Sequence, residues 1–187
     1  TYLINMCRLS EMQKKGKIKM EKKDPRYQAY IQILKEELIP AMGCTEPIAL
    51  AYAAAVARKT LGEMPDKVVV EASGSIIKNV KSVIVPNTGH LKGINAAAAA
   101  GIVAGDPDKK LEVIATVSQE QIRQMKQFME EVPIQVVHME DGCTFDIIVT
   151  VFSGKSYAKV RIANFHTNIV LIEKNGEVLK SEAVSDD

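Results

Sequence analysis

The sequence predicts an α+β fold, with buried alanine-rich helices in the front half of the chain and an antiparallel sheet with one packed helix in the back half. Two front segments, residues 47–61 and 94–103, are apolar on nearly all sides, which is typical of buried helices. In the back half, short β-branched runs are separated by Asp-Gly, Ser-Gly and Asn-Gly pairs, which favour chain reversals. Because 47% of the 187 residues are hydrophobic, the chain can bury a core in one domain, or in one domain with an appendage.

The two ends of the chain read differently from the part between them. The first nineteen residues mix basic and scattered apolar residues without a sustained period, and Met20 follows as a candidate native start, so we expect a non-native or disordered leader. The last eight residues are polar and lack a core face, so we expect a frayed tail. The expected division is a leader at 1–19, a helical part with the Cys44 and Thr88-Gly89 loops at 20–109, an α+β unit at 110–179 and a tail at 180–187.

The front elements follow from helical spacing and from turn residues. A helix is expected over 25–39, since apolar residues recur at helical spacing and Pro40 ends the pattern. The helix at 47–61 starts at a proline, and Val68 to Val70 form a short β-branched strand bounded by turn residues. Further on we expect a strand at 83–85, a polar glycine-bearing loop at 87–93 and the alanine helix at 94–103.

The back elements alternate between strands and one helix. Ser118 and Gln121 form a capping-box pattern before an apolar face, which predicts a helix over 119–131 that stops before Pro133. The methionines and the phenylalanine of that face are expected to be core residues. Val160 and Ile162 alternate with basic residues, so one face of that strand is expected to be buried. The expected strands are 111–117, 134–139, 145–152, 157–164 and 169–173.

Charge and apolar patterning argue against nucleic-acid and membrane partners, and cysteine content bears on the compartment. With 24 basic against 23 acidic residues, the chain has no electrostatic footprint for nucleic acid or acidic membranes. The apolar run around the alanines is broken by glycines and is too short to span a bilayer. Three cysteines without a CxxC pair, and no apolar signal segment, favour the cytoplasm. The three histidines have no zinc-site spacing and are expected to be polar loop or strand residues.

The segment from Met42 to Pro47 places a thiol, Cys44, where a long apolar helix begins. We expect Pro47 at the first helical position, with Thr45 or Glu46 as the cap. Free backbone N–H groups and the helix dipole favour a thiolate there, which ligates metals or attacks electrophiles. The alternative is that Cys44 is a small buried apolar residue, as most free cysteines are.

The loop from Asn87 to Gly93 is a second junction of this kind. It opens onto the alanine helix, so its N–H groups could hold a carboxylate or another anion. Ordinary turn chemistry explains Gly89 and Gly93 about as well. Cys143 lies in an Asp-Gly-Cys turn before a strand and is expected to be structural.

Four motifs together resemble, in this order, the iron-sulfur L-cysteine desulfidases, which belong with the alpha chains of iron-sulfur L-serine dehydratases. The motifs are Gly43 to Pro47, Ser73 to Val80, Val85 to Gly89 and His166 to Asn168, and the resemblance covers residues 20–179. It implies a 4Fe-4S cluster, without pyridoxal phosphate, that assists removal of the β-substituent of L-cysteine or L-serine. The resulting aminoacrylate hydrolyses to pyruvate and ammonia.

The resemblance also implies roles for single residues. Cys44 would be a cluster ligand or a general base close to the cluster. The substrate carboxylate would be bound by Lys78 and Asn79, with Thr88 and Gly89. His166 and Asn168 would line the site, although loop or strand-end hydrogen bonds explain these polar residues as well.

Only Cys44 matches a cysteine of that family, and one thiolate cannot hold a cluster. We therefore expect the N-terminal part of a longer enzyme, inactive and cluster-free by itself, whose partners are the remaining C-terminal part and a small amino acid; a homo-oligomer is also compatible. The L-serine dehydratase alpha chain is the first alternative. A non-catalytic amino-acid-binding module in the back half, or a structural subunit, are the others.

Overall fold

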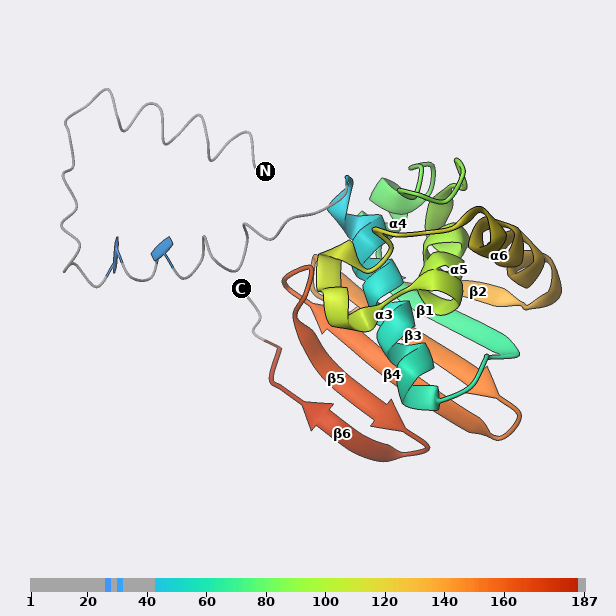
Figure 1. Cartoon of the computed structure of the whole chain (residues 1–187). Coiled ribbons are helices and arrows are strands. Elements are labelled where there is room, and N and C mark those ends of the chain that lie inside the picture. The colour runs from blue at the N-terminus through green and yellow to red at the C-terminus, as the bar shows by residue number, and fades with distance from the viewer. Residues whose placement is uncertain (1–25, 28–29, 32–42, 185–187) are drawn as a thin grey trace, which may run out of the picture. The chain divides into compact units, whose positions relative to one another are not determined.

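The computed structural model describes residues 26–27, 30–31 and 43–184 of the chain (Figure 1). The chain divides into two compact units, residues 1–39 and 40–187, and every element named below belongs to the second. Of the first unit only four helical residues are described, namely Arg26, Tyr27, Tyr30 and Ile31. The expected leader, and most of the helix expected over 25–39, lie outside the described residues.

A six-stranded sheet organises the second unit and confirms the α+β class. The strands are β1 (Lys67–Ser73), β2 (Ile134–Met139), β3 (Asp146–Ser153), β4 (Ser156–Ala163), β5 (Ile169–Lys174) and β6 (Glu177–Ser181). Their order is β2-β1-β3-β4-β5-β6, and β1 pairs parallel with β2 but antiparallel with β3. The sheet is therefore mixed and not wholly antiparallel. β1 comes from the front half of the chain and lies between two strands from the back half. The division expected at residue 110 runs through this sheet.

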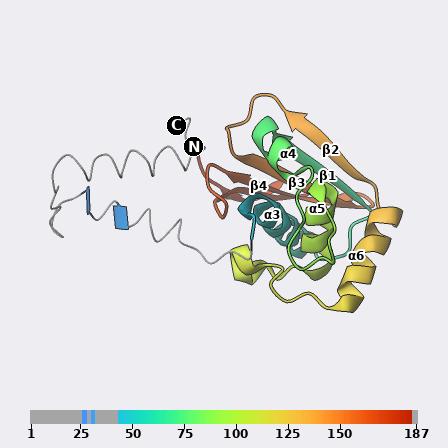
Figure 2. The same cartoon turned by 90° about the horizontal axis from the view of Figure 1, so that it is seen from above.

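Two buried helices cover one face of the sheet, α3 (Thr45–Leu61) and α5 (Gly93–Ala104), as Figures 1 and 2 show. Alternate strand residues point toward them, and Val70, Val149 and Val160 are fully buried. A third long helix, α6 (Gln119–Glu131), packs against α5. The short helix α4 (Gly74–Val80) follows β1 directly. None of the described helices has the length and apolarity needed to cross a membrane.

Helices α3 and α5 approach each other closely, as their alanine content predicts. A Cβ atom added to Gly101 would lie 2.0 Å from the carbonyl oxygen of Ala51, and one added to Gly105 would lie 2.7 Å from the Cβ of Ala55. Only residues with little or no side chain fit such a contact. Small residues along both helices therefore set the distance between the two backbones.

The capping box expected at the start of α6 is present. The Gln121 N–H donates to the Ser118 hydroxyl at 3.2 Å, and the Ser118 N–H donates to the Gln121 side-chain oxygen at 2.9 Å. Ile122, Met125 and Phe128 are buried on one face, which confirms Met125 and Phe128 as core residues, whereas Met129 is only half-buried.

Two expectations for the middle of the chain are wrong. Residues 111–117 form no strand, because a 3-10 helix (Pro107–Glu112) and turns replace it. The Asn87 side-chain amide donates to the carbonyl oxygens of Ile114 and Ala115, so these oxygens are hydrogen-bonded by a loop side chain and not by a neighbouring strand. The strand expected at 83–85 is reduced to one bridge between Ile84 and Lys92.

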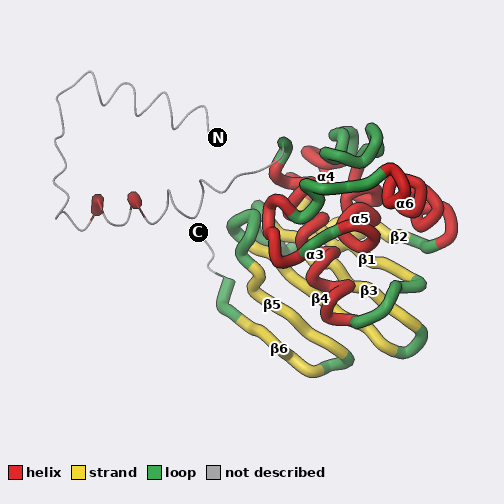
Figure 3. Tube along the Cα trace, in the orientation of Figure 1, coloured by secondary structure: helices red, strands yellow, loops and turns green. Residues whose placement is uncertain are grey.

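Two further elements were not expected. Residues 74–80, to which no element was assigned from the sequence, form α4, and β6 extends to Ser181, so the start of the expected frayed tail is ordered (Figure 3). A seven-residue helix is too short to display a helical period, and β6 is a short edge strand whose Val178 and Leu179 are exposed.

Candidate functional site

The helix that follows Cys44 begins two residues earlier than its proline suggests. Cys44 is the N-cap of α3, with φ −62° and ψ 124°, and Pro47 is buried in the first turn. No side chain caps this helix, so the cap expected from Thr45 or Glu46 is wrong. Gly43 has φ +145°, and a Cβ atom there would lie 3.1 Å from Pro86 Cγ. Gly43 thus lets the chain turn sharply against the loop that follows residue 85, which leaves Cys44 exposed at the helix start.

Cys44, Glu46 and Asn79 form a hydrogen-bonded group that joins α3 to α4, here called the Cys44 cluster. The Cys44 thiol donates to Glu46 Oε2 at 3.1 Å, and Asn79 Nδ2 donates to Glu46 Oε1 at 3.4 Å. Each carboxylate oxygen of Glu46 therefore receives one donor. Of these residues, Cys44 and Asn79 were expected in the site from the sequence, whereas Glu46 was expected only as a helix cap. The signal for Glu46 was its position in the first helical turn, two residues after the thiol.

The electrostatics of the Cys44 cluster differ from the expectation of a thiolate. Partial burial of the sulfur, together with the hydrogen bond to Glu46 and its negative charge, raises the pKa of the Cys44 thiol above its ordinary value. Burial acts to raise the pKa of Glu46 as well, but hydrogen bonds from Cys44, its own N–H and Asn79, and the charge of His166, lower that pKa below its ordinary value. At neutral pH the pair is therefore a thiol that donates to a carboxylate. Burial and the nearby carboxylate therefore raise the pKa of Cys44 by more than the start of the helix lowers it.

The structure brings His166 to the same neighbourhood, since its charge acts on Glu46. Its ring contacts the ring of Phe145, with centroids 4.6 Å apart and planes tilted by 59°. Asn168 is used locally, because its Nδ2 donates to the Ala163 carbonyl oxygen at 3.0 Å. Of the two residues expected from this motif, His166 thus acts electrostatically on the Cys44 cluster. Asn168 stabilises the loop between β4 and β5 in which it lies.

The expected carboxylate-binding residues also separate into two groups. Lys78 is exposed on α4 beside Asn79, within reach of solvent. Thr88 is fully buried, and its hydroxyl donates to the Val85 carbonyl oxygen at 2.7 Å. A Cβ atom on Gly89, whose φ is +65°, would lie 3.2 Å from Ile122 Cγ2. Thr88 and Gly89 therefore shape a turn that packs on α6, and the Thr88 hydroxyl already has an acceptor.

Cys143 belongs to a separate group around a buried carboxylate. Asp146 is fully buried and accepts hydrogen bonds from Arg161 at 2.9 and 2.6 Å and from the Cys143 N–H at 3.2 Å. The Cys143 thiol donates to the Phe145 carbonyl oxygen at 2.9 Å, and burial raises its pKa. This agrees with the structural role expected for Cys143. The ion pair between Asp146 and Arg161 was not expected, because fifteen residues separate its members.

The described residues do not fit a metal cluster. Among residues 26–27, 30–31 and 43–184, no group of three or more His, Cys, Asp or Glu side chains is arranged to hold a metal ion. The Cys44 cluster offers one thiol and one carboxylate, whereas a 4Fe-4S cluster takes about four thiolates. Further ligands would have to come from outside these residues.

Comparison with known proteins finds relatives that are longer than this chain. It is 59% identical over 160 residues to a UPF0597 protein of Desulfitobacterium hafniense, which covers 86% of this chain and 37% of the relative. UPF0597 proteins of Lachnoclostridium phytofermentans and Treponema denticola are 47% and 44% identical over 160 and 154 residues. These matches cover 86% and 82% of this chain, and 38% and 36% of the relatives. The chain thus spans little more than a third of the relatives' length, and no family model matches it.

These findings overturn the family assignment made from the four motifs. The similar proteins are all named UPF0597 protein, and none of these names refers to an iron-sulfur desulfidase or dehydratase. The motifs are short turns and helix starts, which local backbone needs can produce by themselves. The Thr88-Gly89 turn is an instance, since its side-chain contacts serve the fold.

Proposed function

We propose that the complete protein is a lyase that removes the β-substituent of a small amino acid, L-cysteine or L-serine, in the cytoplasm. The observation that supports it is the hydrogen bond from the exposed Cys44 thiol to the Glu46 carboxylate. Such a pair can take up and pass on a proton at the surface of the chain, where a substrate held by another part of the protein could reach it. The amino-acid-binding module remains the alternative.

The acid–base roles follow from the two pKa shifts. Glu46 is ionised at neutral pH and accepts the hydrogen bond of Cys44, so it can take up the thiol proton, although its lowered pKa and the raised pKa of Cys44 both oppose this transfer. The thiolate formed in this way is a stronger base than an ordinary one, because the surroundings raise the pKa of its thiol. It would take the proton from the substrate Cα, the Cα–H electrons would form the double bond of aminoacrylate, and sulfide or hydroxide would leave with the electrons of its bond to Cβ. Water then converts aminoacrylate to pyruvate and ammonia.

The neighbours of Glu46 are positioning residues in this proposal. Asn79 holds one carboxylate oxygen, so that the other faces Cys44. The charge of His166 keeps Glu46 ionised. Help for the leaving group would fall to the remaining part of the protein, and a 4Fe-4S cluster there stays a prediction.

The test is an anaerobic assay of the full-length protein after incubation with iron and sulfide. Pyruvate and hydrogen sulfide from L-cysteine, with L-serine in parallel, are the readouts. Cys44→Ser and Glu46→Gln should each lower kcat about 100-fold or more, as loss of an acid–base group does. Cys143→Ser and Glu63→Gln are the matched controls and should retain activity. Saturable amino-acid binding without any product would favour the binding module, and near-normal kcat in Cys44→Ser would contradict the proposed role.

A separate prediction concerns Lys78, which would bind the substrate carboxylate. Lys78→Ala should raise KM about tenfold and leave kcat nearly unchanged, because the lost contact exists equally in substrate and transition state. Lys81→Ala, at the exposed end of the same helix, serves as the control. An unchanged KM in Lys78→Ala would remove Lys78 from the site.

A further inference from the structure

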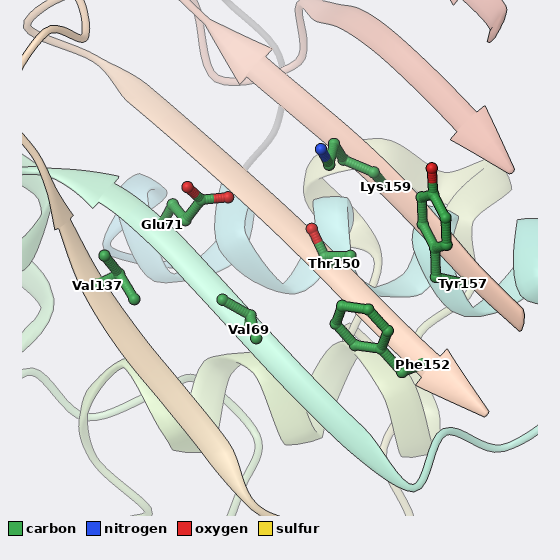
Figure 4. Close-up of a pocket in the computed structure, with 7 residues that line it drawn as sticks. All are labelled: Val69, Glu71, Val137, Thr150, Phe152, Tyr157 and Lys159. Atoms are coloured by element: carbon green, nitrogen blue, oxygen red, sulfur yellow. The ribbon is translucent and has the colours of Figure 1, made fainter. Parts of the chain in front are cut away.

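The sheet has a second face, opposite α3 and α5, and a depression of about 340 Å³ lies on it (Figure 4). Its shape follows from the register of β1, β3 and β4. Val69, Thr150 and Lys159 lie side by side in one row, and Phe152 and Tyr157 pair in the next. Because Val69 and Thr150 are short and the two aromatic rings are large, a hollow forms over the short side chains.

Two side chains of opposite charge line this depression without pairing. No ion pair or hydrogen bond joins Glu71 or Lys159 to another side chain among the residues that the structure describes. The carboxylate opposite Lys159 in the register is Glu173, and it accepts the hydroxyl of Tyr157 instead. Lys159 thus has an ammonium group available to an anion, and Glu71 has a carboxylate available to a cation.

The spacing of the two charges suits a small ligand that carries both signs. Glu71 lies on β1, two residues beyond Val69, and Lys159 lies on β4 with β3 between them, so their backbones are about 12 Å apart. Figure 4 shows both charged groups over the same part of the sheet, with the Thr150 hydroxyl below them. Val69, Val137 and Phe152 add an apolar wall.

We propose that this depression is a second binding site, separate from the Cys44 cluster, for a free α-amino acid. The ligand carboxylate would bind Lys159 and the Thr150 hydroxyl, and the ligand ammonium would bind Glu71. A small side chain would lie on the apolar wall. The ligand bridges two charges that are too far apart to form a direct pair.

The test uses the chain itself, labelled with 15N, in titrations with L-serine and glycine followed by amide chemical shifts. Saturable shifts at Val69, Thr150 and Lys159 are expected, with a Kd of about 1 mM. Acetate and methylamine carry one charge each and should bind roughly tenfold more weakly or not at all. Acetate binding as tightly as L-serine would overturn the proposal, because Lys159 would then be a simple anion contact.

Variants locate the site. Lys159→Met and Glu71→Gln should each weaken L-serine binding about fivefold or more, whereas Lys126→Met and Glu130→Gln on the exposed side of α6 should not. Cys44→Ser should bind L-serine as the wild type does. Binding that survives both charge removals, or that is lost in Cys44→Ser, would place the ligand elsewhere and overturn the proposal. A lack of saturable shifts in the wild type would do the same.

Discussion

Partial burial and the Glu46 carboxylate together keep protonated the only thiol that is exposed at a helix start in the described part of the chain. The dipole of a long helix favours a thiolate at its N-terminus by an amount of about 1 kcal/mol or less. Partial burial, and then a carboxylate in direct hydrogen-bond contact, act in the opposite direction and prevail. Cysteine at a helix start is therefore a weak predictor of a thiolate when an acidic residue follows in the first turn.

Glu46→Gln should lower the pKa of Cys44, because it removes the negative charge and leaves a neutral partner. Burial would still hold that pKa above its ordinary value. The rate of iodoacetamide alkylation at Cys44, followed across a pH series by peptide mass spectrometry, measures the change. Alkylation should be faster in Glu46→Gln at each pH below the wild-type pKa, and Glu63→Gln should leave the curve in place. A curve that moves to higher pH would contradict the assigned cause.

The ion pair between Asp146 and Arg161 differs from the surface pairs because one partner is fully buried. Arg161→Met would leave the Asp146 carboxylate buried without its counter-charge, and we expect a loss of about 3 kcal/mol in the free energy of unfolding. Urea denaturation measures this loss. Arg123→Met breaks an exposed pair with Glu120 and should change the same quantity by about 0.5 kcal/mol or less. Equal effects of the two substitutions would show that burial does not govern this pair.

Among the elements, those with a strong local pattern were predictable from the sequence. Helices α3 and α5 were found from their continuous apolar surface, and α6 from its capping box and apolar face. The turn pairs located β3, β4 and β5. The strand expected at 111–117 is absent, although Leu111, Val113 and Ile114 are buried there. Apolar spacing reports burial, and it cannot distinguish a buried turn from a short strand.

The contact of α5 with α3 gives a prediction for Gly101. Gly101→Ala would place a methyl group 2.0 Å from the Ala51 carbonyl oxygen, so the two helices would have to separate. We expect a loss of at least about 2 kcal/mol in the free energy of unfolding, although alanine is the better helix former. Asn95→Ala, an exposed position on the same helix, is the control and should be neutral or slightly stabilising. A neutral Gly101→Ala would mean that the two helices can separate freely.

For the molecule as a whole, the α+β class was predictable from the sequence, but the order and direction of the strands in the sheet were not. The parallel pairing of β1 with β2 joins segments that no local signal connects, so a wholly antiparallel sheet was expected. The candidate site was predictable only in part for the same reason. Cys44 and Asn79 lay in short motifs, whereas the contact of Glu46 with Asn79 across two helices comes from packing.

The strand order predicts how stability is distributed across residues 40–187. β1 and β3 are interior strands, and Val68, Val70 and Val149 are fully buried there, whereas β6 is an edge strand with two exposed apolar residues. Amide hydrogen exchange should therefore be slowest in β1 and β3 and at least roughly 1,000-fold faster in β6, which can open without unfolding the core. Exchange followed by two-dimensional NMR measures this difference. Equal protection in β3 and β6 would mean that the sheet opens only as a unit.

The position of β1 between β2 and β3 also constrains how the protein folds during synthesis on the ribosome. Both neighbours of β1 in the sheet come from chain beyond residue 133, so its valines have no partner strand when they leave the exit tunnel. During that interval the apolar side chains of one strand and two helices are exposed to solvent, and nascent chains in this state bind chaperones. A stop in translation before residue 134 would consequently yield a product prone to aggregation, however intact its helices.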